Sequence, residues 1–317
     1  MDRGRAPRSG ALSRTASLDA RAALRAPVSA FASTGRVAQL PRSLRFPAVP
    51  VFRPNAHFAR AEVQAMTNTP PKVVLITGAN RGIGRATARL VAARGWSVGV
   101  NYARDANAAE ATADAVRAAG GQAYVVRGDV ANEADVIGMF DAVQGAFGRL
   151  DALVNNAGIV APSLPLADMD VARLTRVFDT NVLGAYLCAR EAARRLSTDR
   201  GGAGGVIVNV SSIAARLGSP NEYVDYAGSK GAVDTLTLGL AKELGPHGVR
   251  VNAVRPGLVA TEIHASGGQP GRAERLGAQT PLGRAGDADE VAEAIVWLLS
   301  DAASYVTGAL LDVGGGR

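Results

Sequence analysis

The chain has 317 residues, of which 47% are apolar, 35 are basic and 28 are acidic. This length can form one large domain or two small ones with a substantial hydrophobic core. No apolar run approaches the roughly 18 residues of a membrane span, so we expect no membrane segment. The single cysteine, Cys188, excludes an intramolecular disulfide and favours a reducing, cytoplasmic location. The histidines lie far apart and show no ligand spacing, so we predict no metal site.

The net charge of +7 is concentrated at the amino-terminal end. Residues 1–65 contain eleven arginines, no lysine and three acidic residues, which gives +8. Residues 66–317 contain 24 basic and 25 acidic residues, which gives −1. Because the excess positive charge is confined to the first segment, it does not indicate a nucleic-acid partner.

Residues 1–65 are rich in Arg, Ala, Ser and Pro and keep no helical or strand periodicity. Such a composition buries too little apolar surface to offset the chain entropy, so we predict a disordered tail. Its Arg-rich, acid-poor make-up also resembles an organelle transit peptide. We favour a start codon assigned too early, because Met66 stands just before the first predicted strand. The folded domain is therefore predicted over residues 66–317.

From Lys72 onward, short runs of β-branched residues alternate with longer, Ala-rich amphipathic segments. We predict strands at Val73–Ile76, Val98–Asn101, Ala123–Val126, Ala152–Val154, Val206–Val210, Arg250–Ala253 and Leu310–Val313. We predict helices near residues 83–94, 106–119, 132–147, 170–197, 223–244 and 288–299. Continuous apolar strands that alternate with helices are typical of a parallel sheet covered on both faces. The pattern therefore predicts one doubly wound α/β domain.

A glycine-rich loop, Thr77–Gly84, follows the first predicted strand and opens the first helix. Its glycines, Gly78, Gly82 and Gly84, would let the backbone approach a pyrophosphate held at the helix N-terminus. The Gly-x-x-x-Gly-x-Gly spacing alone is weak evidence, since an ordinary strand-to-helix turn can carry it. Its place at the start of a long series of alternating strands and helices favours a nucleotide site.

Three further motifs follow this loop along the chain. They are Asn155–Gly158 after the fourth strand, Tyr226 and Lys230 in a Tyr-x-x-x-Lys pattern, and Pro256-Gly257 after the sixth strand. In order and spacing, the four motifs resemble those of the short-chain dehydrogenase/reductase family, over residues 72–317. The resemblance implies a Rossmann-type sheet of seven parallel strands. It also implies a homotetramer whose two-fold interfaces use the helices of Asn181 and Tyr226 and the segment Leu310–Gly316.

The end of the second strand favours NADP(H) as the cofactor. An NAD site commonly places an acid there, which binds the adenosine ribose and repels a 2′-phosphate. In this sequence Tyr102 stands where the acid would be expected, while Arg81 and Arg104 can clamp a phosphate. The alternative is that both arginines are solvated surface residues. We predict NADP(H) because the absence of the acid and the presence of the two arginines both favour binding of a 2′-phosphate.

The resemblance assigns further cofactor contacts. Asp129 would bind the adenine edge, Asn155 would line the ribose side, and Thr261 would hold the nicotinamide carboxamide. The full predicted cofactor site consists of Thr77, Gly78, Asn80, Arg81, Gly82, Ile83, Gly84, Tyr102, Arg104, Asp129, Val130, Asn155, Ala157, Gly158, Tyr226, Lys230, Pro256, Gly257, Val259 and Thr261.

Tyr226 and Lys230 lie four residues apart on a predicted helix, so their side chains share one face. A lysine on this otherwise core-facing stripe is costly to bury without a partner. An ammonium beside a phenol stabilises the phenolate, so we expect a lowered pKa for Tyr226. The phenol can then give a proton to a carbonyl oxygen or take one from an alcohol. The resemblance implies that the lysine also holds the nicotinamide ribose.

Two more catalytic positions follow from the resemblance. Ser212, after the fifth strand, would hydrogen-bond the substrate oxygen, with Ser211 as the less favoured candidate. Taken alone, this serine pair would be a polar cap on the strand end. Asn181 interrupts an apolar helix face and would bind a water relay that reaches the lysine, or would be a satisfied core asparagine. Tyr223 is a competing phenol, but no lysine follows it at the same spacing.

These motifs predict an NADP(H)-dependent oxidoreductase that transfers a hydride between nicotinamide and a carbonyl or secondary alcohol. The small-molecule substrate stays open, because the expected mobile lid, Leu258–Leu282, is rich in Gly and polar residues. The chain resembles bacterial 3-oxoacyl-carrier-protein reductases and sugar dehydrogenases about equally. The alternative is a non-catalytic NADP-sensing protein on the same fold, which would be expected to lose the tyrosine or the lysine.

Overall fold

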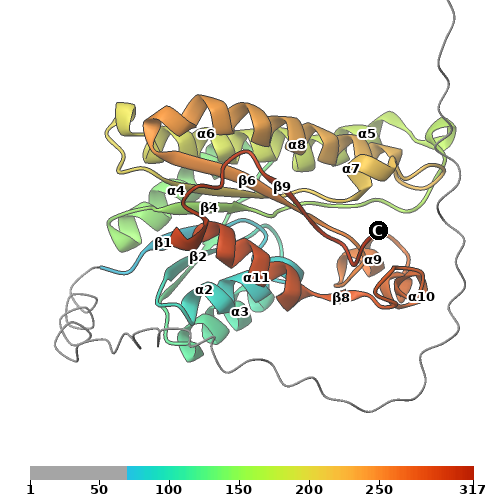
Figure 1. The fold of residues 1–317 in the computed structure, drawn as a ribbon, viewed down its shortest axis with the longest axis horizontal. Coiled ribbons are helices and arrows are strands. Elements are labelled where there is room, and N and C mark those ends of the chain that lie inside the picture. The colour runs from blue at the N-terminus through green and yellow to red at the C-terminus, as the bar shows by residue number, and fades with distance from the viewer. Residues whose placement is uncertain (1–69) are drawn as a thin grey trace, which may run out of the picture. The chain divides into compact units, whose positions relative to one another are not determined.

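A seven-stranded parallel sheet forms the centre of the computed structural model, which describes residues 70–317 (Figure 1). Its order is β3-β2-β1-β4-β5-β6-β9. The strands are β1 (Val73–Ile76), β2 (Ser97–Tyr102), β3 (Ala123–Arg127), β4 (Ala152–Asn155), β5 (Gly205–Val210), β6 (Val249–Pro256) and β9 (Leu310–Val313). The predictions for the tail, residues 1–65, lie outside the described residues.

Helices cover both faces of the sheet, as the alternating pattern predicts (Figure 1). On one face, α2 (Gly82–Ala92), α3 (Ala106–Ala118) and α11 (Ala288–Leu299) share a hydrophobic cluster with the strands. On the other face, α4 (Glu133–Phe147), α6 (Gly184–Leu196) and α8 (Val224–Leu244) share a second cluster. The β1 run Val73–Ile76 is buried on both sides and contributes to both clusters. The predicted doubly wound fold is confirmed.

The helix expected over 170–197 is not continuous. It consists of α5 (Val171–Phe178), a π-helical segment η2 (Asp179–Leu183), and α6. A π turn carries i→i+5 hydrogen bonds and so inserts one residue into the helical register. Phe178, the last residue of α5, is 41% exposed. Asn181, in the middle of the π turn, is buried.

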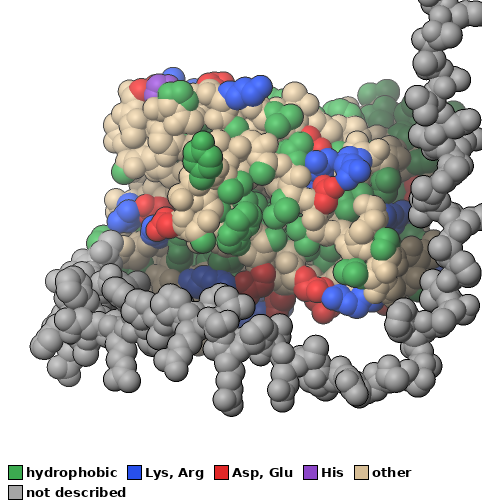
Figure 2. Space-filling view, viewed as in Figure 1, with side chains coloured by type: hydrophobic (Ala, Val, Ile, Leu, Met, Phe, Trp, Pro, Cys, Tyr) green, Lys and Arg blue, Asp and Glu red, His purple; other side chains and the backbone are tan. Residues whose placement is uncertain are grey.

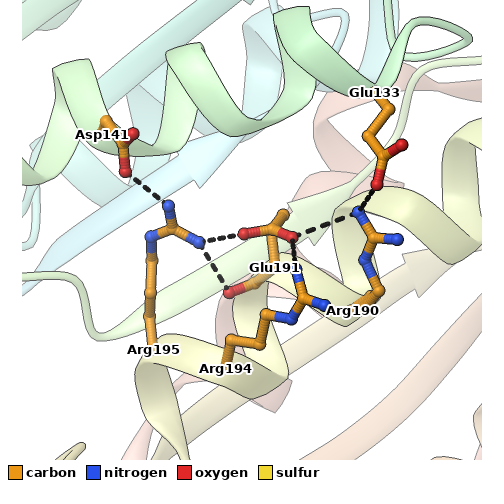
Figure 3. Close-up of polar contacts among 6 residues, drawn as sticks. All are labelled: Glu133, Asp141, Arg190, Glu191, Arg194 and Arg195. Atoms are coloured by element: carbon orange, nitrogen blue, oxygen red, sulfur yellow. Dashed lines mark hydrogen bonds and ion pairs between the residues drawn. The ribbon is translucent and has the colours of Figure 1, made fainter.

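Ion pairs join α6 to α4 on the surface of the second helical layer (Figure 3). The carboxylate of Glu191 is buried and accepts hydrogen bonds from Arg194, at 2.7 Å, and from Arg195. Arg195 also reaches Asp141 of α4 at 2.5 Å, and Arg190 reaches Glu133 at 2.6 Å. The six side chains carry balanced charge, which indicates a link between helices rather than a ligand site.

The predicted lid, Leu258–Leu282, contains β7 (Val259–Ala260), α9 (Ile263–Ser266) and α10 (Arg272–Gly277). β7 pairs in parallel with β8 (Gly286–Asp287). This pairing joins the first residues of the lid segment to the residues that follow its last one. The mobility of the segment stays a prediction. Within residues 70–317, no helix is long and apolar enough to cross a membrane, and no cluster of His, Cys, Asp or Glu could hold a metal ion.

Candidate active site

A cavity of about 790 Å³ lies at the carboxyl ends of the central strands. In a doubly wound sheet this edge is where ligands bind, because the strand order reverses between β1 and β4. Seventeen of the predicted site residues line the cavity: Gly78, Asn80, Arg81, Gly82, Ile83, Arg104, Asp129, Val130, Ala157, Gly158, Ser212, Tyr226, Lys230, Pro256, Gly257, Val259 and Thr261. The structure therefore brings the glycine loop and the Tyr-x-x-x-Lys pair into one cavity.

The glycine loop has the backbone geometry of a phosphate cradle. Gly78 and Gly82 adopt φ angles of +60° and +51°, a region that side chains with a Cβ rarely occupy. A Cβ on Gly78 would lie 3.1 Å from the Cα of Ala157. Helix α2 begins at Gly82, so its unpaired N–H groups open toward the cavity. These features fit the pyrophosphate of a dinucleotide.

Thr77, Gly84 and Asn155 do not line the cavity but hold its wall. The Thr77 hydroxyl accepts hydrogen bonds from the backbone N–H groups of Asn156 and Ala157, both at 2.9 Å. A Cβ on Gly84 would lie 2.6 Å from the Asn156 side chain. The Asn155 side chain donates to the carbonyl of Ala185 at 2.8 Å. All three therefore position the loop and the end of β4.

A buried asparagine that the sequence reasoning missed supports the same loop. The Asn101 side-chain oxygen accepts from the Gly78 N–H at 3.1 Å, and its nitrogen donates to the Gly128 carbonyl at 3.0 Å. Asn101 lines the cavity and joins the first three strand ends. The signal available in the sequence was a polar residue within the apolar run of β2.

The two arginines proposed to select the cofactor both line the cavity and are exposed. Arg81 donates to the Ser266 hydroxyl of α9 at 2.9 Å, so it also joins the glycine loop to the lid segment. Tyr102 ends β2, with its side chain partly buried, and is not part of the cavity lining. No acidic side chain occupies the Tyr102 position, but Asp105, which the sequence reasoning did not include, lines the cavity nearby.

Tyr226 and Ser212 face the same part of the cavity. Burial raises the pKa of Tyr226 above its ordinary value, although a hydrogen bond with the Ser212 side chain opposes the rise. Ser212 accepts from the Ala214 N–H at 3.1 Å, which fixes its side chain at the end of β5. Ser211 instead donates to the Lys230 carbonyl at 3.1 Å, so its hydroxyl is engaged with the backbone of α8.

Lys230 is buried beside Tyr226, but its ammonium does not hydrogen-bond the phenol in the structure. Its Nζ donates to the Val210 carbonyl at 2.7 Å and lies 5.6 Å from the centre of the Tyr226 ring. Burial lowers the pKa of Lys230 to about 8, and the carboxylate of Asp234 opposes that shift. The expectation of a lowered Tyr226 pKa was wrong, because desolvation of the phenol outweighs stabilisation by its neighbours.

Asn181 does not line the cavity itself but holds one of its walls. Its oxygen accepts from the Ile159 N–H at 2.8 Å, and its nitrogen donates to the Ile159 carbonyl at 2.9 Å and to the Ser229 hydroxyl at 3.1 Å. A Cβ on Gly158 would lie 3.4 Å from the Asn181 oxygen and 3.5 Å from Lys230 Nζ. The π turn thus brings the asparagine, the glycine and the lysine together.

The substrate end of the cavity contains residues that no motif indicated. Arg272 of α10 pairs with Glu222, with its Nη1 at 2.9 Å from Oε1, and its guanidinium lies 5.2 Å from the centre of the Tyr223 ring. Burial raises the pKa of Tyr223. This competing phenol is therefore packed against a cation of the lid segment. The polar segment between β7 and α11 has no periodicity from which these contacts could be predicted.

This combination of fold and site matches known proteins. The family model described as enoyl-(acyl carrier protein) reductase matches residues 78–317. The uncharacterized oxidoreductase YgfF of Escherichia coli (strain K12) is 53% identical over 245 residues, which cover 77% of this chain and 99% of that protein. A short-chain type dehydrogenase/reductase from Mycobacterium marinum has a TM-score of 0.73 and 37% identity, over 80% of this chain and 98% of that one. The chain belongs to the short-chain dehydrogenase/reductase family.

A further solved member of the short-chain dehydrogenase/reductase family carries a cofactor. The 3-ketoacyl-(acyl-carrier-protein) reductase from Brucella melitensis, complexed with NADH, has a TM-score of 0.72 and 35% identity, over 78% of this chain and 98% of that one. Membership makes this chain an oxidoreductase of alcohol and ketone groups that uses a nicotinamide cofactor. The family predicted from the four motifs is confirmed.

Proposed function

We propose that this protein is an NADP(H)-dependent oxidoreductase that reduces a carbonyl compound to a secondary alcohol, or runs the reverse oxidation, with Tyr226 as the general acid and base. One observation carries the proposal. A single cavity contains both a phosphate cradle, at Gly78–Ile83, and a half-buried phenol beside a buried lysine, at Tyr226 and Lys230.

The bound nicotinamide supplies a hydride to the carbonyl carbon, or accepts one from the alcohol carbon. Tyr226 gives its phenolic proton to the carbonyl oxygen in reduction and takes the hydroxyl proton in oxidation. Ser212 donates a hydrogen bond to the same oxygen, which fixes its position beside the phenol. Because the pKa of Tyr226 lies above its ordinary value, the phenol is protonated at neutral pH, which is the form needed for reduction.

Lys230 supports this proton transfer electrostatically and through the cofactor. Its buried ammonium contacts the Val210 carbonyl and lies near the Tyr226 ring. Lys230 also lines the cavity, so its ammonium can hold a ribose hydroxyl of the bound cofactor. A positive charge at this depth favours the phenolate that forms when Tyr226 has given up its proton. Asn181 contributes by fixing Ile159 and, with it, the wall opposite the lysine.

NADP(H) is the proposed cofactor because of the charge at the end of β2. Arg81 and Arg104 line the cavity on this side, and neither forms an ion pair within residues 70–317. Two guanidinium groups without an ion-pair partner among these residues, and an uncharged Tyr102, suit a 2′-phosphate better than a pair of ribose hydroxyls. The NADH complex of the Brucella relative makes direct comparison of the two cofactors essential.

The proposed substrate is a 3-oxoacyl thioester or another ketone in the direction of reduction, and a sugar or other secondary alcohol in the direction of oxidation. The relationship to a 3-ketoacyl-(acyl-carrier-protein) reductase supports the first class. We also propose a homotetramer in the cytoplasm, on the family resemblance and on exposed apolar side chains of α5, α6, α8 and α11.

The test is a screen of 3-oxoacyl thioesters, cyclic ketones and ketoses, read by loss of NADPH or NADH absorbance. Each compound is assayed with the wild-type chain and with Tyr226→Phe, which removes one oxygen. Oxidation of NADPH that depends on both the compound and Tyr226 supports the proposal. Tight binding of NADPH without turnover of any member of the three classes would instead support a cofactor-sensing protein.

A further inference from the structure

A buried ion pair lies directly before the proposed catalytic tyrosine, and the reaction described above does not use it. Asp225 precedes Tyr226 in the first turn of α8, and Arg173 lies in the first turn of α5. The Arg173 Nε lies 2.8 Å from one Asp225 carboxylate oxygen, and Nη2 lies 3.3 Å from the other. The two side chains are only 7% and 1% exposed. Neither lines the cavity.

On the side of α8, the carboxylate of Asp225 fixes the backbone of Tyr226. Its Oδ1 accepts the Tyr226 N–H at 2.9 Å. The N–H groups in the first turn of a helix have no acceptor within the helix, so this bond satisfies an otherwise free donor. The position of the Tyr226 backbone is therefore tied to a side chain that is itself held by Arg173.

On the other side, Arg173 fixes a wall of the cavity. Its Nη1 donates to the Pro162 carbonyl at 2.5 Å. Residues Ile159–Pro162 all line the cavity. Asn181 holds the start of this segment through both backbone groups of Ile159, and Arg173 holds its end. Arg173 and Asn181 come from the consecutive elements α5 and η2, so one stretch of the chain holds both ends of the wall Ile159–Pro162.

We propose that Arg173 and Asp225 form a positioning pair that sets the distance between the Tyr226 phenol and the substrate wall Ile159–Pro162. This inference rests on the proposed function, since it assigns a role in the same reaction. The arginine fork spreads its donors over three nitrogens and so reaches a carboxylate and a backbone carbonyl at separate positions, whereas the three N–H donors of a lysine all lie on one nitrogen. A buried ion pair is a weak source of net stability, which leaves positioning as the property that both charges serve.

The test compares conservative changes of each partner in the full chain. Arg173→Lys keeps the charge but replaces the planar fork that spans Asp225 and Pro162 with a single nitrogen. Asp225→Asn keeps an acceptor for the Tyr226 N–H but loses the charge, and Asp225→Ala removes both. A matched control is Glu191→Gln, which alters a carboxylate that is 3% exposed and also paired with arginines, but is not part of the cavity lining.

We expect Arg173→Lys and Asp225→Ala to lower kcat up to about 10²-fold and to raise KM for the carbonyl substrate, since a displacement of about 1 Å has this effect on proton transfer. Asp225→Asn should recover part of the lost kcat relative to Asp225→Ala. The Kd for NADPH, measured by fluorescence titration, should stay within about twofold of wild type, because the glycine loop is held by other residues. Hydrogen exchange of the Tyr226 peptide should accelerate in Asp225→Ala and not in Glu191→Gln.

The inference is overturned if Arg173→Lys and Asp225→Ala lose melting temperature as Glu191→Gln does but keep wild-type kcat and KM well below that temperature. It is also overturned if Asp225→Asn and Asp225→Ala have equal kcat. Tyr226→Phe separates this failure from failure of the proposed function. If Tyr226→Phe is inactive while the Arg173 and Asp225 variants are fully active, the positioning role is refuted and the proposed reaction stands. If Tyr226→Phe is active, the proposed reaction itself is refuted.

Discussion

The ammonium of Lys230 lies against the Val210 carbonyl with no carboxylate in hydrogen-bond contact, and its charged form is therefore costly. Tyr226, one turn earlier, is affected by the same desolvation in the opposite direction. Burial thus favours the neutral form of both groups in the cofactor-free protein. Binding of a nucleotide and a substrate oxygen beside them would add partners for the charged forms.

The lowered pKa of Lys230 predicts a pH dependence of stability. Because the folded-state pKa, about 8, lies below the ordinary value of 10.5, the unfolded chain binds more protons between these values. The contribution of Lys230 therefore makes the free energy of unfolding rise as pH increases from about 8 toward 10.5. In urea titrations of the cofactor-free protein at several pH values, Lys230→Met should lose this rise. Lys242→Met, which alters an exposed lysine of the same helix, should keep it, and parallel slopes for all three proteins would contradict the assignment.

Arg104 gives a second prediction at the scale of single residues. If its guanidinium binds the 2′-phosphate, Arg104→Ala should weaken NADPH binding by roughly tenfold or more and leave NADH binding nearly unchanged, as expected for loss of a charged hydrogen bond. Arg85→Ala, on the exposed side of α2, is the matched control and should bind both cofactors as wild type does. Calorimetric titration with each cofactor decides this. Equal losses for NADPH and NADH, or no loss, would show that the arginine does not select the cofactor.

At the scale of elements, the sequence patterns located strands and helices about equally well. The helix predicted over 288–299 coincides with α11, and those predicted near 83–94, 106–119, 132–147 and 223–244 each agree with one observed helix to within two residues. The bounds of β1 and β9 agree with those expected from their apolar runs. The helix expected over 170–197 contains a π turn, because insertion of one residue leaves the average period of apolar residues almost unchanged. Local patterns also give no information about contacts between distant residues. Arg173 and Arg272 were not predicted for this reason, because their partners lie about 50 residues away in the chain. The motifs and the family resemblance located Tyr226, Lys230 and the glycine loop, together with Thr77, Asn155 and Asn181, which hold the cavity walls. They did not indicate Asn101, Arg173 or Arg272.

The ion-pair cluster between α4 and α6 predicts the effect of a buried carboxylate on stability (Figure 3). Burial alone would raise the pKa of Glu191, but hydrogen bonds and charges of Arg195 and Arg194 outweigh it, so the pKa is lowered. Glu191→Gln should therefore lower the free energy of unfolding at pH 7 by about 1–3 kcal/mol. A lowered folded-state pKa contributes stability above pH 4.5 that is lost as the pH falls, so the difference should shrink in acid. Denaturant titrations of the wild-type and Glu191→Gln proteins at pH 7 and pH 4 measure this difference in the free energy of unfolding.

Glu110→Gln is the control for this prediction, because Glu110 is exposed on α3 and has no ion-pair partner within residues 70–317. It should unfold like wild type at both pH values. A Glu191→Gln protein that is as stable as Glu110→Gln at pH 7 would mean that the cluster adds nothing to the packing of α4 on α6.

At the scale of the whole molecule, apolar side chains are exposed on two separate surfaces. The first surface, on α5, α6 and α8, exposes Val171, Phe178, Tyr186 and Leu238 at 77%, 41%, 43% and 42%. The second exposes Trp297 of α11 and Tyr305 just beyond it at 42% and 103%. Figure 2 shows apolar side chains gathered over β9 and α11. Two apolar surfaces of this kind suit two distinct two-fold interfaces.

The proposed tetramer follows from this arrangement. Wild-type protein should have the mass of four chains by light scattering at micromolar concentration. Phe178→Asp or Tyr305→Asp should each break one interface and give dimers, and the double variant should give monomers, because a buried unpaired charge is strongly unfavourable. Tyr124→Asp, at an exposed site on β3 outside both surfaces, should leave the tetramer intact. A monomeric wild type would refute the assembly.

The most direct test of the account is the turnover of Tyr226→Phe on a substrate that the wild-type chain reduces. The substitution removes only the phenolic oxygen, so the fold and the Kd for NADPH should be preserved. Loss of acid catalysis alone should lower kcat by about 10²–10⁴-fold. Lys230→Ala should be similarly slow and should also bind NADPH more weakly, and the double variant should be scarcely slower than the worse single one, since the two residues act together. A Tyr226→Phe protein with near-normal turnover would contradict the central claim and make Tyr223 the next phenol to change.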